Sequence, residues 1–447
     1  MSTTAPSPPW SDLLPELLGH VIAHLPFPGD CARFRAVCRS WHAAARQHVA
    51  RQLPWIMLPD GSFCTIGGGG GGAFHRPIPG LPPNATFLGG TGDWLALDCC
   101  ADDAFRRRTH LPDNKFLQPR RRDVRHGHAY SLHNPFSGET VPLPELDSIA
   151  ETFEIRRVVM RSGGPGDLVA VVTNNWNHPV ILCRPGKGRF VIPCLNVFDV
   201  AFFRGALYGL ARDDDLIAFD LAEDGDGAPV VTRFKRVIKH PLAEGEEDLW
   251  SWLDDYNYYY DDDDEELSSG SSDEASTGDE PNHPEEEDDD EGFNGDEMVL
   301  SCVVRVEDKE SPDEDTKGVI EITPHLVESC GGELLLVKHH VQVPSWLCKP
   351  YTRKVEVFKA DIDAGKWIPV TGGDALAGGE ALFLGPLFSK AIRVYGDLKE
   401  GFMYFAHKDD VFDTVSWAIR PFSLSPQRKL VSDDELMTWL FPPEIVI

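Results

Sequence analysis

Acidic side chains are concentrated in residues 241–304, and a dense group of carboxylates is one candidate for binding calcium. A calcium loop that began at Asp290 would place Asn294 and Gly295 acceptably. Ser301, however, occupies the position that needs a bidentate Glu. The spacing therefore predicts a solvated acidic segment rather than a calcium site.

Two other polar groups could bind a metal or act as acid and base, namely His126–His128 and Asp213–Asp215. The two histidines follow Arg125 and have no further ligands near them in the sequence, so we expect them to be polar loop residues. The aspartates lie between two predicted strands, where Asp commonly closes a hairpin turn. No serine-nucleophile, P-loop or zinc-protease motif occurs in the chain.

Glycine and cysteine spacing also argues against a cofactor. Gly67–Gly72 matches a dinucleotide-binding pattern trivially, but the residues that follow cannot begin a helix. The 10 cysteines contain no C-x-x-C pair and no zinc-finger spacing. Adjacent Cys99 and Cys100 fit reduced thiols better than a disulfide framework, which indicates a cytoplasmic or nuclear location. We therefore expect no catalytic residue, no metal and no cofactor.

Composition limits the remaining classes. The chain has 447 residues, of which 42% are hydrophobic, so it can form one small and one large domain. Its net charge is −30, yet residues 241–304 hold 25 Asp and Glu with no Lys or Arg, which leaves 47 acidic against 42 basic residues elsewhere. Such a block is predicted to be disordered, and it opposes nucleic-acid binding. There is no signal peptide and no run of about 18 apolar residues, so no membrane partner is expected.

The first 50 residues must form the helical part of the chain. A helix that begins at Pro15 and ends before Pro26 carries one apolar stripe, formed by Leu17, Leu18, Val21, Ile22 and Leu25. A second helix, capped by Asp30, is predicted to carry another, formed by Phe34, Val37, Cys38 and Trp41. So short a segment cannot bury both faces by itself, and another surface must cover part of them.

From about residue 54 the pattern changes to short apolar runs separated by Gly, Pro, Asn and Asp. Groups of four predicted strands recur at residues 86–144, 154–193, 197–238, 326–370 and 382–430, with further strands at 55–78 and 298–323. A four-strand unit that repeats every 40–50 residues or so is typical of a β-propeller. The five groups and the further strands together predict six or seven blades. A β-sandwich would need fewer strands and would show no such period.

The N-terminal segment resembles an F-box of the plant type. The motifs that carry the resemblance are L-P-E-L-L at Leu14–Leu18, L-P at Leu25–Pro26 and R-F-R-A-V-C-R-S-W at Arg33–Trp41. The resemblance implies docking onto the Skp-type adaptor of a cullin-based ubiquitin ligase. The adaptor-binding residues that it implies are Leu14, Pro15, Leu17, Leu18, Ile22, Leu25, Val37, Cys38 and Trp41.

The strand-rich part resembles plant F-box proteins that carry a kelch-like β-propeller of the domain-of-unknown-function 295 family. The matching motifs occur, in order, at residues 92–98, 134–144, 326–337, 355–361, 381–385 and 401–406. The last of them departs from the family, since Phe402–Tyr404 stands where a turn is usual. We expect residues 1–9 to be disordered, residues 10–50 to form a helical F-box domain and residues 54–447 to form an all-β propeller. The propeller is expected to carry insertions at 67–72, 101–128 and about 241–297.

Two functions follow as alternatives: a non-catalytic substrate receptor of a ubiquitin ligase that binds an unknown protein target, or a ligase-independent scaffold. A glycosidase built from two distant carboxylates in a propeller is the enzymatic alternative, and no residue favours it. The basic Arg106–Arg125 and acidic Asp254–Glu297 insertions could attract each other weakly, or could be independent loops. Phosphorylation within the acidic insertion is predicted at Ser271, Ser276 and Thr277, each followed by an acid three residues later.

Overall fold

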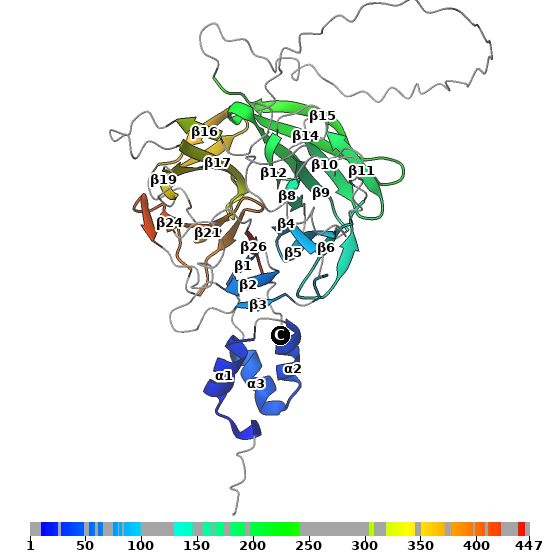
Figure 1. The fold of residues 1–447 in the computed structure, drawn as a ribbon, viewed down its shortest axis with the longest axis vertical. Coiled ribbons are helices and arrows are strands. Elements are labelled where there is room, and N and C mark those ends of the chain that lie inside the picture. The colour runs from blue at the N-terminus through cyan, green and yellow to red at the C-terminus, as the bar shows by residue number, and fades with distance from the viewer. Residues whose placement is uncertain are drawn as a thin grey trace, which may run out of the picture.

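The protein was analysed as a computed structural model. It describes residues 10–442 except 26–27, 49–52, 59–60, 66–74, 79, 83–84, 100–128, 145, 147–154, 162–163, 165, 174–178, 193–196, 242–303, 308–318, 345–349, 372–375, 377, 397, 407–409 and 422–436. A small helical module lies outside a ring of β-sheets, next to the strands that follow it in the chain (Figure 1).

The helical module contains a short 3-10 helix, η1 (Trp10–Asp12), and three α-helices, α1 (Pro15–Ala23), α2 (Pro28–Arg35) and α3 (Arg39–His48). Pro15 begins α1, as predicted, where a missing N–H has no cost. The module has a core of its own, formed by Leu18, Ile22, Cys31, Phe34, Ala44 and Ala45.

The prediction of one continuous second helix was wrong. The helix breaks at residues 36–38 between α2 and α3, so Phe34, Val37 and Trp41 do not share a helical face. Asp30 was also placed wrongly as a cap, because α2 already begins at Pro28. The Asp30 carboxylate instead accepts a hydrogen bond from Arg33 at 2.8 Å. The break brings the rings of Phe34 and Trp41 together, with centroids 4.4 Å apart.

Six antiparallel or mixed sheets form the blades of the propeller (Figure 1). Blade 1 contains β26 (Thr438–Leu440), β1 (Trp55–Met57), β2 (Ser62–Thr65) and β3 (His75–Pro77); blade 2 contains β4 (Ala85–Thr91), β5 (Trp94–Cys99), β6 (Tyr130–His133) and β7 (Thr140–Pro142); blade 3 contains β8 (Ile155–Met160), β9 (Val169–Thr173), β10 (Val180–Arg184) and β11 (Gly188–Ile192).

Blade 4 contains β12 (Val197–Phe203), β13 (Ala206–Ala211), β14 (Leu216–Glu223) and β15 (Pro229–Ile238), with a short 3-10 helix, η2 (Arg212–Asp214), in its second turn. Blade 5 contains β16 (Val304–Glu307), β17 (Val319–Glu328), β18 (Leu334–Val343), β19 (Tyr351–Asp361) and β20 (Lys366–Pro369); blade 6 contains β21 (Glu380–Leu384), β22 (Lys390–Arg393), β23 (Phe402–Phe405), β24 (Asp410–Asp413) and β25 (Ala418–Pro421).

The predicted repeats lie in blades 2 to 6, and the strands predicted at 55–78 lie in blade 1. The strands predicted at 298–323 did not form a blade of their own: β16 and the first part of β17 belong to blade 5. The number of blades is six. The turn residues act as expected: Arg204 and Gly205 both have positive φ (49° and 84°) in the β12–β13 hairpin. Asn134 closes the β6–β7 turn by accepting hydrogen bonds from the backbone N–H groups of Phe136 and Ser137.

The ring is closed by a strand that was not predicted. Strand β26 from the end of the chain pairs with β1, and Trp439 lies opposite Ile56. On its other side β26 packs against the inner strand of blade 2, where a Cβ on Gly90 would lie only 2.8 Å from the Trp439 carbonyl oxygen. Only glycine permits this close approach between blades 1 and 2.

Blade 6 departs from a simple antiparallel meander. Strand β21 pairs antiparallel with β22 and parallel with β23, with Leu382 beside Met403. The doubt about a turn at Phe402–Tyr404 is resolved, because these residues form β23 and are buried. The apolar core lies mostly between neighbouring blades; Leu182 of blade 3, for example, packs in one cluster with Phe219 of blade 4.

Candidate adaptor-binding surface and axial pocket

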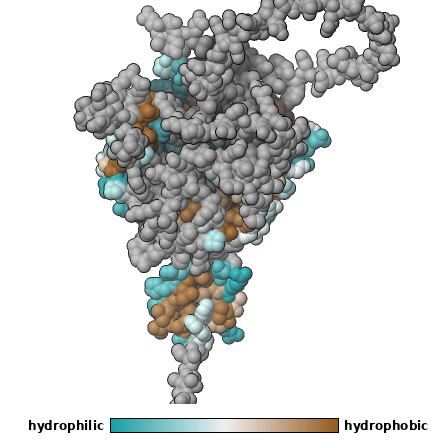
Figure 2. Space-filling view, in the orientation of Figure 1, coloured by the Kyte–Doolittle hydropathy of each residue, from teal (hydrophilic) through white to brown (hydrophobic). Residues whose placement is uncertain are grey.

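The helical module presents large apolar side chains to solvent. Trp10 is 72% exposed, Leu14 62%, Val37 55%, Leu17 48% and Val21 40%. Figure 2 shows hydrophobic residues gathered on the visible side of the module. We call these five residues the apolar patch. A monomeric protein rarely exposes so much contiguous apolar surface unless a partner covers it.

The nine residues predicted to bind an adaptor divide into three groups in the structure. Exposed residues are Leu14, Pro15, Leu17 and Val37; half-buried residues are Leu25, Cys38 and Trp41; fully buried residues are Leu18 and Ile22. The two buried side chains belong to the core of the module rather than to its surface. Trp41 is held in place by its indole N–H, which donates to the Trp10 carbonyl oxygen at 3.0 Å. The predicted adaptor-binding set contained neither Trp10 nor Val21, although the helical periodicity had placed Val21 on the apolar stripe.

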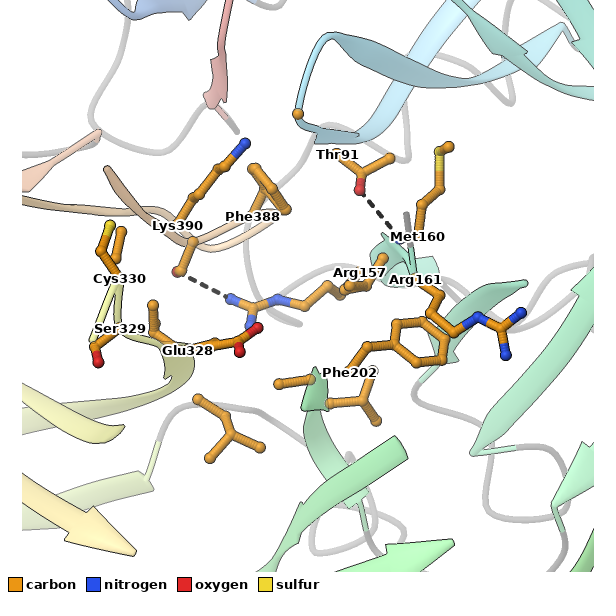
Figure 3. A pocket seen from close by; sticks show the side chains of 18 residues that line it. Thr91, Arg157, Met160, Arg161, Phe202, Glu328, Ser329, Cys330, Phe388 and Lys390 are labelled. Carbon is orange, nitrogen blue, oxygen red and sulfur yellow. Dashed lines mark hydrogen bonds between the residues drawn. The ribbon is translucent and has the colours of Figure 1, made fainter. Parts of the chain in front are cut away.

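A second candidate site is a pocket of about 330 Å³ at the centre of the ring (Figure 3). The ends of β4, β8, β12 and β17 and the β21–β22 loop line it. Its walls combine polar and charged residues with apolar side chains, which include Val159, Phe202, Leu326 and Phe388. Phe202 and Val159 are only half-buried, so the pocket exposes apolar surface that no other described residue covers.

A buried ion pair forms one wall of this axial pocket. Arg157 of β8 donates to the carboxylate of Asp199 on β12, and both side chains are almost inaccessible to solvent. Asp199 also accepts hydrogen bonds from the backbone N–H groups of Val200 and Leu326, each at 2.7 Å. Burial raises the pKa of Asp199, whereas Arg157 and the two N–H donors favour the ionised form. The pair therefore joins the inner strands of blades 3, 4 and 5.

The same network continues into blade 6. Arg157 donates to the Gly385 carbonyl oxygen at 3.2 Å and to Ser389 Oγ at 3.4 Å. Ser389 Oγ in turn lies 3.2 Å from Nδ1 of His325, which is fully buried. Burial, together with the charge of Arg157, lowers the pKa of His325 well below its ordinary value, so the ring is neutral. The serine and histidine are thus parts of a structural network that also holds the arginine.

Charged side chains at the edge of the pocket are largely paired within the chain. Arg161 forms an ion pair with Asp167 at 2.5 Å. The Lys390 ammonium lies 5.1 Å from the centre of the Phe441 ring. Glu328 is exposed, and partial burial raises its pKa. The rim therefore carries charges of both signs and has no strong electrostatic preference.

The other predicted polar groups are structural where the structure describes them. Asp213–Asp215 lies in the β13–β14 turn, as predicted. Asp215 is buried and accepts hydrogen bonds from Arg236 at 3.1 Å and from the backbone N–H of His240 at 2.6 Å. Within the described residues no three His, Cys, Asp or Glu side chains gather as a metal site requires.

Cysteines in the described part of the chain are free thiols, and several are buried. Burial raises the pKa of Cys183 to about 12, which makes this thiol unreactive. None of the helices that the structure describes is long and apolar enough to cross a membrane. Several candidates lie outside the described residues: His126–His128, the segments 67–72, 106–125 and 254–297, and the sites Ser271, Ser276 and Thr277.

Sequence reasoning missed the axial network because its members are distant in the chain. Arg157 and Asp199 are separated by 42 residues, and Arg157 and Ser389 by 232. A signal did exist: both charges lie within predicted strands that are otherwise rich in apolar residues, and a charge in a buried strand requires a partner. Which residue pairs with each charge, and that a pocket lies beside the pair, can be known only from the closed ring.

Comparisons with known proteins match these two regions separately. Residues 10–50 match the F-box domain, and residues 74–423 match the KIB1-4 beta-propeller. A segment of 51 residues is 45% identical to the Arabidopsis thaliana F-box protein At2g05970, and one of 61 residues is 36% identical to a second protein of that plant, At4g22180. These segments cover 11% and 13% of this chain and only 13% and 15% of the relatives. Because the propeller match extends over most of the chain, this F-box protein belongs to the KIB1-4 beta-propeller family.

Proposed function

We propose that this protein is the substrate-recognition subunit of an SCF-type ubiquitin ligase. The observation that carries the proposal is the apolar patch on a module that matches the F-box domain. The patch residues of α1 and its N-terminal flank, together with Val37, would contact the Skp-type adaptor and through it a cullin. The half-buried Trp41 and Leu25 would support this surface from behind.

The proposed mechanism requires no chemistry from this chain. With the F-box held by the adaptor and a protein target held by the propeller, the lysines of the target stay close to the ubiquitin-carrying enzyme. The gain is an increase in effective concentration, which can exceed the affinity of either contact alone. The helices lie outside the ring, so both surfaces can be occupied at once (Figure 1). The free buried thiols suit a reducing compartment, the cytoplasm or the nucleus.

Adaptor binding tests the proposal directly. Replacing Leu14 and Leu17 together by Ala should weaken binding to a purified Skp-type adaptor by at least tenfold or so, because interface energy concentrates in a few apolar anchors. The pair leaves the core of the module intact, which a Leu18→Ala change would not. Val415→Ala is the matched control: this side chain is 66% exposed but lies in the propeller.

The alternative is a ligase-independent scaffold whose helical module has no adaptor. Unchanged adaptor binding by the Leu14 and Leu17 double variant, with wild-type melting behaviour, would favour the scaffold. Loss of binding in the double variant and retention in Val415→Ala would favour the receptor. Regulation of the receptor by phosphorylation of Ser271, Ser276 or Thr277 is a separate proposal, which phosphate mapping of the intact chain would test.

A further inference from the structure

The propeller's axial pocket has the features of a binding site, and none of the residues that the structure describes fills it. Its volume of about 330 Å³ is close to the lower end of ligand pockets, which begin near 300 Å³ or so. A pocket of this size holds one or two side chains of a peptide, not a folded domain. It also lies where segments of four blades and the β21–β22 loop converge, so an occupant contacts most of the ring (Figure 3).

Its walls indicate what kind of side chain it takes. Phe202 of β12 and Val159 of β8 line the pocket and are half-buried. Leu326 and Phe388 also line it, and both are buried. Figure 3 shows the Phe202 ring among the side chains that line the pocket. Apolar surface left in contact with water inside a concavity is stabilised when an apolar group covers it.

The charges around the pocket argue against an anionic occupant such as a phosphate. The two arginines that line it already have acidic partners, Asp199 for Arg157 and Asp167 for Arg161. A phosphate would have to compete with these carboxylates and would also meet the exposed carboxylate of Glu328. The buried Arg157 is held further by Ser389 and Gly385, so it is not available without breaking the network.

We propose that the axial pocket is the target-recognition site and that it binds a peptide segment through an aromatic or large aliphatic side chain without requiring phosphorylation. This inference rests on the proposed function only in calling the bound protein a target of the ligase. Peptide binding by the pocket does not depend on that function. The partner is therefore a protein that exposes a short segment with an apolar anchor residue.

A random peptide library displayed on phage and selected on the full-length protein tests the inference. We expect selected peptides to share an aromatic or large aliphatic residue. Their affinity for Phe202→Ala should fall by about tenfold or more, as expected for loss of a central apolar contact. Phe190→Ala is the matched control, because Phe190 is also half-buried and packs on the same core cluster, but from the outer strand β11. It should bind the peptides within about twofold of the wild type.

A second variant and a competitor keep the result interpretable. Val159→Ser alters the part of the lining that β8 contributes, and it should weaken the same peptides if Phe202→Ala proves unstable. Inorganic phosphate should not displace the peptides, and Lys390→Ala should retain them. Peptides that compete with phosphate and need Lys390 would overturn the inference in favour of an anion site, and peptides equally bound by Phe202→Ala would place recognition elsewhere. Adaptor binding by the Leu14 and Leu17 variant is measured separately, so failure of the ligase role leaves this result unaffected.

Discussion

The helical module and the centre of the propeller use their side chains in opposite ways. The module keeps a core of six buried apolar side chains and exposes Trp10, Leu14 and Val37 to solvent. The centre of the propeller buries an arginine, an aspartate and a histidine and supplies partners for the ion pair from four blades. The helical module thus exposes apolar side chains to solvent, whereas the centre of the propeller buries charged ones.

This difference distinguishes side chains whose contacts are satisfied within the fold from side chains that a partner would cover. Buried charges are tolerated only where the fold itself provides opposite charges and hydrogen bonds, so the axial network reports on ring closure. Exposed apolar side chains lack an equivalent internal explanation and therefore report on a partner. Changes in the buried ion-pair network at the axis should alter stability, whereas changes on the apolar patch should alter binding alone.

The largest effect is expected when the axial ion pair is broken. Asp199→Ala leaves Arg157 buried without its counter-charge and removes the acceptor of the Val200 and Leu326 N–H groups. Loss of one partner of a buried pair costs about 3–5 kcal/mol. Denaturant unfolding monitored by tryptophan fluorescence should record this loss. The control is Glu333→Gln, which removes an exposed pair with Lys359 and should cost under 1 kcal/mol or so.

A smaller effect is expected from the two adjacent leucines of α1, which the fold treats differently. Leu18 is 1% exposed in the core of the module, and Leu17 is 48% exposed on the patch. Leu18→Ala should destabilise the module by about 2–5 kcal/mol, while Leu17→Ala should stay within about 0.5 kcal/mol. Hydrogen exchange of the α1 and α3 amides resolves the module from the propeller. Equal loss of protection in both variants would contradict the division into core and patch.

The contrast also explains how far the sequence could predict the structure. Turns such as Arg204–Gly205 and Asn134 are set by local chemistry, and these gave the blades and their boundaries. Strand β26 is three residues long and forms only because β1, some 380 residues earlier, leaves an edge unpaired. The break between α2 and α3 was missed because a continuous apolar repeat passes through it. The same repeat could not distinguish Leu18, which the core of the module buries, from Leu17, which is exposed.

A pH effect of intermediate size is expected from His325. Its folded-state pKa lies well below the ordinary value because the ring is buried next to Arg157. In the unfolded chain His325 therefore takes up a proton near pH 6.5, whereas in the folded chain it stays neutral. The free energy of unfolding is highest above this pH and falls as the pH decreases. The loss amounts to about 1.4 kcal/mol per pH unit until the folded-state pKa is reached.

His325→Asn checks this sign. The amide can still reach Ser389, whose Oγ lies 3.2 Å from the histidine Nδ1, but it cannot be protonated. Melting temperatures measured from pH 7.5 down to about 5 should fall less steeply in the variant than in the wild type. His340, whose pKa burial also lowers, contributes in the same direction and remains in both proteins. Parallel curves for the two proteins would assign the acid sensitivity to other groups.

The smallest effect on the propeller is expected from deletion of Asp254–Glu297, the acidic insertion. A segment this rich in like charge and poor in apolar residues has little to bury, so its removal should change the melting temperature by no more than a few degrees. The deletion lies between Ile238, the end of β15, and Val304, the start of β16, so both flanking strands remain. If binding to a basic partner surface weakens while the melt is unchanged, the insertion acts on recognition, in the same manner as the apolar patch. A larger drop in melting temperature would instead assign it to the fold, together with the axial network.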